Sequence, residues 1–136
     1  MGGEEVDLRE GLSRRKAGMR FQHRQLDVFV SEVSLALKRE CARDCETAVY
    51  QLAGALKAHF AVEEGVIFPA LRGLRPDLSN WIATSEREHE RLRHQLDRLA
   101  CATTASDSAT ARLLLEEFQA ALGAHELDEE CILESA

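Results

Sequence analysis

The chain has 136 residues, of which 45% are hydrophobic and 30% are charged. This length suits a single domain, and this balance is typical of a folded soluble protein rather than a disordered chain. The 17 basic and 24 acidic residues give a formal net charge of -7. Because such a charge repels phosphate backbones and anionic lipid headgroups, we expect neither a nucleic acid nor a membrane as a partner.

The residue types favour helices. The chain has five Phe, one Trp, one Tyr and only two Pro, while Ala, Leu, Glu and Arg are abundant. Good helix formers therefore outnumber the β-branched and aromatic residues that strands prefer, and we expect an all-α protein.

Four segments carry core-type residues at alternating intervals of three and four, which places them in one stripe along a helix. Short stretches with Gly, Pro or small polar residues separate these segments and are typical of turns. Connections of this length predict an up-down-up-down antiparallel four-helix bundle. In chain order we expect an N-terminal arm at residues 1–12 and helices at about residues 13–40, 44–68, 79–101 and 108–134.

Polar residues occupy several positions that these stripes assign to the core, where apolar residues are expected. Each predicted helix supplies one histidine, and the second and fourth helices add a glutamate four residues later. In chain order these residues are His23, then His59 and Glu63, then His89, then His125 and Glu129.

The same residues form an internal repeat. When the sequence is shifted along itself until His23 aligns with His89, His59 aligns with His125 and Glu63 with Glu129, without a gap. We therefore predict two similar helical hairpins, roughly residues 13–70 and 79–136, related by an approximate two-fold axis near the histidines.

The positions of the six residues predict a metal site. A spacing of four places His59 and Glu63 within about 40° and about 6 Å of each other on one helix face. Antiparallel packing brings all four histidines to one end of the bundle. Two buried carboxylates cost several kcal/mol unless they are compensated, and metal ions compensate them. Imidazole and carboxylate without thiolate suit iron, manganese or zinc, and six such ligands suit two ions with an open coordination position for a small ligand.

Other polar residues near the predicted site are weaker candidates. His94 lies about 140° around the helix from His89, so we expect it at the surface. Glu64 and Glu130 lie off the ligand face by a similar angle, and solvent exposure or a hydrogen bond to a ligand is favoured over coordination. Glu86 forms an ExxH pair with His89 and remains an extra candidate ligand, although ferritin-type sites use two such pairs.

The four cysteines show no metal-binding or redox pattern beyond one CxxxC pair. We expect reduced, partly buried thiols, and the sequence assigns no role to Cys41, Cys45, Cys101 or Cys131. The N-terminal segment is charged and lacks the apolar core of a secretory signal, and no run approaches the ~20 apolar residues of a membrane span. We therefore expect a cytoplasmic protein.

The pattern of ligands resembles the hemerythrin-like, HHE cation-binding family over nearly the whole chain. The strongest local match runs from His59 to Leu71 and reads HFAVEEGVIFPAL; REHERL around His89 and HELDEECIL from His125 support it. The resemblance implies a four-helix bundle around a non-haem di-iron centre with an oxo or hydroxo bridge. It also implies that Glu63 and Glu129 bridge the irons.

The chain departs from oxygen-carrying members of that family at two positions. Arg93 stands where those proteins have a further histidine, and Glu130 stands where they usually have an aspartate. The pattern is closer to the four-His, two-Glu members, which include iron-sulfur repair and iron-sensing proteins. One iron would then be less fully ligated, which favours reaction with oxygen, peroxide or nitric oxide over reversible carriage.

The leading hypothesis is therefore a di-iron protein that binds or reduces oxygen, peroxide or nitric oxide, and reduction would require a redox partner. Two alternatives stay open: an iron- or oxygen-sensing or iron-handling module without turnover, and a zinc-filled or metal-free structural bundle. Whether the protein is an enzyme, its physiological ligand, its reductant and its oligomeric state do not follow from the sequence.

Overall fold

The computed structural model describes residues 2–135, and within that range every long element is an α-helix. The predicted all-α class is therefore confirmed. The elements are α1 (Gly2–Arg39), α2 (Ala42–Val62), the π-helical turn η1 (Glu63–Ile67), α3 (Phe68–Leu74), the 3-10 turn η2 (Pro76–Leu78), α4 (Ser79–Thr104) and α5 (Ser108–Ser135).

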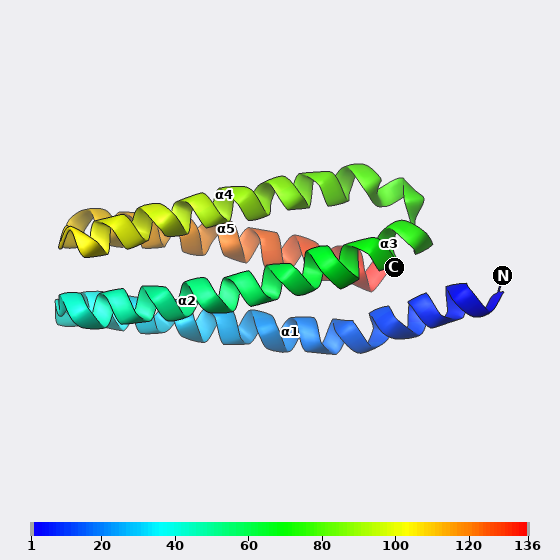
Figure 1. The fold of residues 1–136 in the computed structure, drawn as a ribbon, viewed down its shortest axis with the longest axis horizontal. Coiled ribbons are helices and arrows are strands. Elements are labelled where there is room, and N and C mark those ends of the chain that lie inside the picture. The colour runs from blue at the N-terminus through cyan, green and yellow to red at the C-terminus, as the bar shows by residue number, and fades with distance from the viewer. Residues whose placement is uncertain (1, 136) are drawn as a thin grey trace.

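The four long helices lie alongside one another as a bundle (Figure 1). Helix α1 packs against α2 and α5, and α4 packs against α5 and α2, so each long helix has two long neighbours. Helices α1 and α4 lead away from the end of the bundle that holds the termini, and α2 and α5 return to it (Figure 1). None of the described helices has the length and apolar character needed to span a bilayer.

Two apolar clusters fill the bundle. The larger cluster contains residues from all four long helices, among them Leu26, Leu56, Leu92 and Leu122. The smaller cluster lies at the end where α3 packs, and its members are Leu12, Met19, Ile67, Phe68, Leu71, Ile82 and Leu133. Along α1, the stripe histidine His23 lies between Met19 of the smaller cluster and Leu26 of the larger one, so apolar residues lie on both sides of it.

The N-terminal segment differs from the prediction of an arm at residues 1–12. Residues 2–12 are helical, and α1 begins at Gly2. The physical reason is packing: Leu12 is 4% exposed in the smaller cluster, and Leu8 lies close enough to α3 that a Cβ built on Gly73 would be 3.0 Å from its side chain. The contacts that hold this segment come from a helix that is distant in sequence, which local patterning does not reveal.

The second predicted helix also extends beyond its predicted end near residue 68. The helical segment continues from α2 through η1 into α3, and it ends at Leu74. Pro69 does not stop it: this proline lies just after the π-helical turn η1, where i→i−5 bonds such as Phe68 N–H to Glu63 O have already replaced the regular i→i−4 bonds.

Candidate metal centre

The structure buries all six polar residues that the sequence singled out. Their exposed fractions are 3% for His23, 3% for His59, 0% for Glu63, 0% for His89, 3% for His125 and 1% for Glu129. Each of the four long helices supplies one histidine, α5 adds Glu129, and Glu63 is the first residue of the π-helical turn η1. Single π-helical turns are rare and occur frequently at functional sites.

Each carboxylate lies between histidines from two helices. The Oε1 atom of Glu63 is 2.7 Å from His59 Nε2, and its Oε2 atom is 3.6 Å from His89 Nε2. The Oε1 atom of Glu129 is 3.2 Å from His125 Nε2 and 3.6 Å from His23 Nε2. Both glutamates therefore connect the His23 and His59 side of the cluster with the His89 and His125 side.

The outer nitrogen of each histidine has an oxygen partner. His23 Nδ1 lies 3.1 Å from Glu130 Oε1, and the Nδ1 atoms of the other three histidines each lie 2.6 Å from an oxygen. Those partners are Gln22 for His59, Glu64 for His89 and Glu88 for His125. A carboxylate or amide oxygen can only accept, so each Nδ1 carries the hydrogen and donates it. In a neutral imidazole this leaves the Nε2 lone pair free and directed at the centre, as metal ligation requires.

The inner atoms of the cluster lack the partners that buried polar atoms normally have. His23 Nε2, His59 Nε2, both oxygens of Glu63 and Glu129 Oε1 are buried without a hydrogen bond. His89 Nε2 and His125 Nε2 face each other at 3.0 Å, although the Nδ1 bonds assign a lone pair to both. Two lone pairs at this distance repel unless a cation or a proton lies between them. The residues present therefore fit a metal centre.

The donor atoms fall into two overlapping groups. One consists of Glu63, His89, His125 and Glu129, and the other consists of His23, His59 and Glu129. Within each group the donor atoms lie within 4.8 Å of one another. Cysteine takes no part in either group, and the four cysteines are free thiols.

The oxygen partners of the Nδ1 atoms include Glu64 and Glu130, for which the sequence left solvent exposure or a hydrogen bond to a histidine open. Glu64 and Glu130 each accept a hydrogen bond from a histidine of the cluster, so the hydrogen-bonding role is confirmed for both. Gln22 and Glu88 were missed from the sequence. The sequence could have indicated them: Gln22 directly precedes His23 and Glu88 directly precedes His89, so the shift that aligns the two histidines also aligns these two polar residues.

Two nearby candidates lie outside the cluster. Glu86 is not brought to the centre: its carboxylate pairs with Arg72 at 2.7 Å and its side chain is 44% exposed. Its ExxH spacing places it on α4, but on a face turned toward α3 rather than toward the other histidines. His94 is exposed, as predicted.

Electrostatics within the cluster follow from burial and from the histidines. Burial alone would raise the pKa of Glu63, but the imidazoles of His59 and His89 beside it outweigh burial and lower this pKa to about 2. Burial lowers the pKa of His125. The first shift favours an ionised Glu63 and the second favours a neutral His125, and these are the protonation states of the two groups that bind metal.

The two sides of the cluster have different neighbours. Phe60 stacks on His89 with ring centroids 3.7 Å apart, and the guanidinium of Arg93 lies 5.3 Å from the centre of the Phe60 ring. Arg93 also binds Glu64 at 3.2 Å. On the other side, Glu126 is 7% exposed and lies 3.6 Å from His23 Nδ1. Burial raises the pKa of Glu126 to about 7.

Comparison with known proteins agrees with this geometry. Residues 16–135 match the model of the hemerythrin HHE cation-binding domain. Searches of curated proteins and of solved structures found no significant match. The family match covers well over half of the chain and includes all six residues of the cluster, so the chain belongs to the hemerythrin HHE cation-binding domain family.

Proposed function

We propose that this protein holds two iron ions between its four histidines and two glutamates and uses them to bind or reduce a small ligand such as oxygen, peroxide or nitric oxide. The single observation that carries the proposal is the set of buried, unpartnered imidazole nitrogens and carboxylate oxygens that face one another in the bundle. A bound cation would compensate the free-energy cost of burying these polar atoms without hydrogen-bond partners.

Two ions are favoured over one by the division of the donors. His89 and His125 belong to one group and His23 and His59 to the other, while Glu129 belongs to both. Glu63 directs one oxygen toward each histidine pair. These positions support bridging roles for both glutamates.

Iron is favoured by the ligand types together with the family. Imidazole and carboxylate suit iron, manganese and zinc, and the absence of thiolate from both groups disfavours a structural zinc site. Bound iron would supply redox and Lewis-acid chemistry to a small ligand.

The residues of the chain have separable roles in this proposal. Each Nδ1 donor bond fixes the orientation of its imidazole ring and keeps the proton away from Nε2. Leu26, Leu56, Leu92 and Leu122 exclude water from the large-cluster side, because each is no more than 2% exposed. A dry site strengthens the interactions of the two carboxylates with a cation.

We further propose that the molecule is a complete up-down-up-down bundle of two hairpins related by approximate two-fold symmetry. The hydrogen-bond partners support this proposal. Gln22 serves His59 as Glu88 serves His125, and the shift that aligns His23 with His89 also aligns Glu64 with Glu130.

The test is metal analysis with visible spectra. Protein loaded anaerobically with ferrous iron is expected to hold two ions per chain and to change its visible spectrum on exposure to oxygen, peroxide or nitric oxide. Protein that stays colourless and takes up no iron would contradict the proposal. Iron-loaded protein that is far more stable than metal-free protein, but consumes no peroxide or nitric oxide, would identify a sensing or iron-handling module instead.

A further inference from the structure

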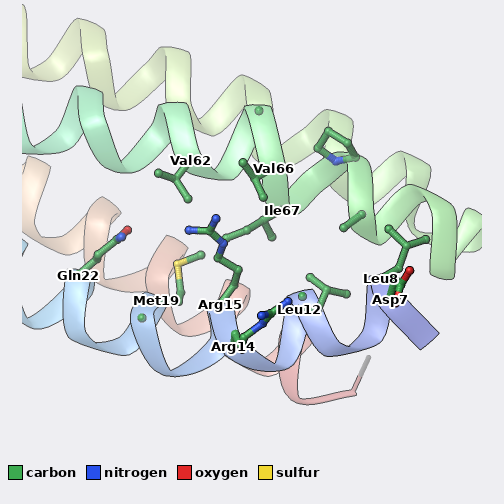
Figure 2. A pocket seen from close by; sticks show the side chains of 15 residues that line it. Asp7, Leu8, Leu12, Arg14, Arg15, Met19, Gln22, Val62, Val66 and Ile67 are labelled. Carbon is green, nitrogen blue, oxygen red and sulfur yellow. The ribbon is translucent and has the colours of Figure 1, made fainter. Parts of the chain in front are cut away.

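A groove separates the N-terminal half of α1 from η1 and α3. Its volume is about 770 Å³, within the range of about 300–1,000 Å³ that is usual for small-molecule sites. Figure 2 shows α1 on one side of the groove and the segment from Val62 to Ile67 on the other.

The groove combines an apolar surface with two guanidinium groups. Leu8, Leu12, Met19, Val62, Val66 and Ile67 provide apolar side chains. Arg15 extends from α1 toward Val62 and Ile67, and Arg14 lies beside Leu12 (Figure 2). Asp7 is the one carboxylate among the lining residues, and it lies near the N-terminal end of the groove (Figure 2).

The two arginines have no ion pair within residues 2–135, although the protein has a net charge of -7. Six other arginines among the described residues have carboxylate partners, for example Arg72 and Arg93, and six others, among them Arg91 and Arg98, do not, so it is the place of Arg14 and Arg15 beside the groove that sets them apart. A guanidinium group beside an apolar surface is suited to bidentate binding of a carboxylate whose remaining atoms are apolar.

Three glycines line the groove. They are Gly11, Gly18 and Gly65, and a Cβ added at any of them would meet no atom within 4 Å, as is also true of Gly54 outside the groove. A larger side chain introduced at Gly11 or Gly18 would therefore project into open space rather than against the rest of the protein.

Part of one wall of this groove lies outside the region that defines the family. The family match begins at residue 16, whereas Asp7, Leu8, Gly11, Leu12, Arg14 and Arg15 precede it. The groove is therefore a feature of this chain that the cation-binding domain does not itself explain.

We propose that this groove binds a small amphipathic carboxylate, with the carboxylate on Arg14 and Arg15 and an aliphatic body against Met19, Val62 and Ile67. The charge of the groove selects an anion, and its apolar surface selects a ligand with an uncharged chain. No groove-lining residue is one of the six residues of the metal centre, although Gln22, which accepts a hydrogen bond from His59, lies at the edge of the groove.

The test uses octanoate as the probe and the full chain as the binding partner, with titration calorimetry as the measurement. Octan-1-ol serves as the neutral control ligand of the same length. Wild-type protein should bind octanoate saturably with a stoichiometry near one and should bind octan-1-ol at least about tenfold more weakly.

Two pairs of variants separate the groove from general effects. Gly11→Leu fills the groove, and Gly54→Leu places the same side chain on an exposed part of α2 where a Cβ also meets nothing within 4 Å. Both changes raise helix propensity equally. R14Q/R15Q removes two charges at the groove, and R91Q/R98Q removes two charges from exposed positions on α4.

Gly11→Leu should abolish octanoate binding and R14Q/R15Q should weaken it at least about tenfold, while both control variants should bind like wild type. If Gly11→Leu does not fold, Gly18→Leu fills the same groove from the next turns of α1. The proposal is overturned if wild type shows no saturable binding, if octan-1-ol binds as tightly, or if the filling variants bind normally. Wild-type dimers that Gly11→Leu converts to monomers would assign the groove to a second copy of the chain and would also overturn it.

Discussion

Replacing His59 by leucine should remove one metal ion and leave the other. His59 belongs to the group with His23 and Glu129, but not to the group of Glu63, His89, His125 and Glu129. The variant therefore keeps all four donors of one group and loses one of the two histidines of the other. We expect two irons per chain in wild type, one in His59→Leu and none when His125→Leu is added. His94→Leu, at an exposed position on α4, should retain two.

The thermal stability should follow the same series. A ligand at 100 times its Kd stabilises the folded state by about 2.7 kcal/mol. Unfolding entropy of about 2.1 cal/mol/K per residue over 136 residues gives about 0.29 kcal/mol/K. Each ion should therefore raise the Tm by about 9 °C. The expected increase on iron loading is about 19 °C for wild type, about 9 °C for His59→Leu and none for the double variant.

The assay combines metal analysis with thermal unfolding followed by circular dichroism, with ferrous iron or with a chelator under anaerobic conditions. Comparing each variant with its own metal-free form removes the effect of the substitution on packing. The assignment would be refuted if His59→Leu retained two irons or if His94→Leu lost one. Loss of both irons from His59→Leu alone would refute the division into two separable donor groups.

Three further changes test other parts of the structure. Gln22→Leu or Glu88→Leu removes the oxygen that accepts from a ligand histidine, and each should weaken iron binding by about 10–100-fold without abolishing it, as measured by competition with a chelator. Phe118→Ala removes a fully buried ring from the larger cluster and should cost about 3–5 kcal/mol, a fall in Tm of about 10–17 °C, with unchanged iron stoichiometry. Burial raises the pKa of Glu126 to about 7, so in the metal-free protein this group should contribute a loss of up to about 3 kcal/mol of stability as the pH rises from about 4.5 through 7. Burial lowers the pKa of His125 and acts in the opposite direction, so the Glu126 contribution is measured as the difference between wild type and Glu126→Gln in denaturant titrations at a series of pH values.

The ligand cluster could be located from sequence because its residues break a strong pattern. A histidine at a core position is noticeable only where its neighbours in the stripe are apolar, as with His23 between Met19 and Leu26. All six residues selected in this way are buried and come together. The apolar pattern locates these residues, whereas the choice of iron depends on the chemistry of their donor atoms.

Other features could not be predicted because they depend on contacts between segments far apart in the chain. Residues 2–12 contain no long apolar stripe of their own, and their helix is held by contacts of Leu8 and Leu12 with the α3 region. Gln22 and Glu88 are polar residues at half-buried positions, where polar residues are ordinary. Only the packing of neighbouring helices brings them within 2.6 Å of a histidine.

The internal repeat relates the proposed ligands to one another, but it does not relate the residues packed around them. The shift that aligns His23 with His89 relates the four histidines, the two glutamates and all four Nδ1 partners. The same shift relates Phe60 to Glu126 and Asp27 to Arg93, and these pairs are chemically different. An aromatic ring under a guanidinium therefore closes the His89 side.

On the His23 side, Asp27 and Glu126 instead line a surface cavity of about 290 Å³. Glu126 is only 7% exposed, whereas Asp27 is exposed to solvent. Neither residue stacks on His23 in the way that the ring of Phe60 stacks on His89. Two ions held by the proposed ligands would therefore occupy unequal positions, because the affinity and reactivity of a bound ion depend on the dielectric and charge around its ligands. The asymmetry between the two halves of this chain thus comes from the residues next to the ligands and not from the ligands themselves.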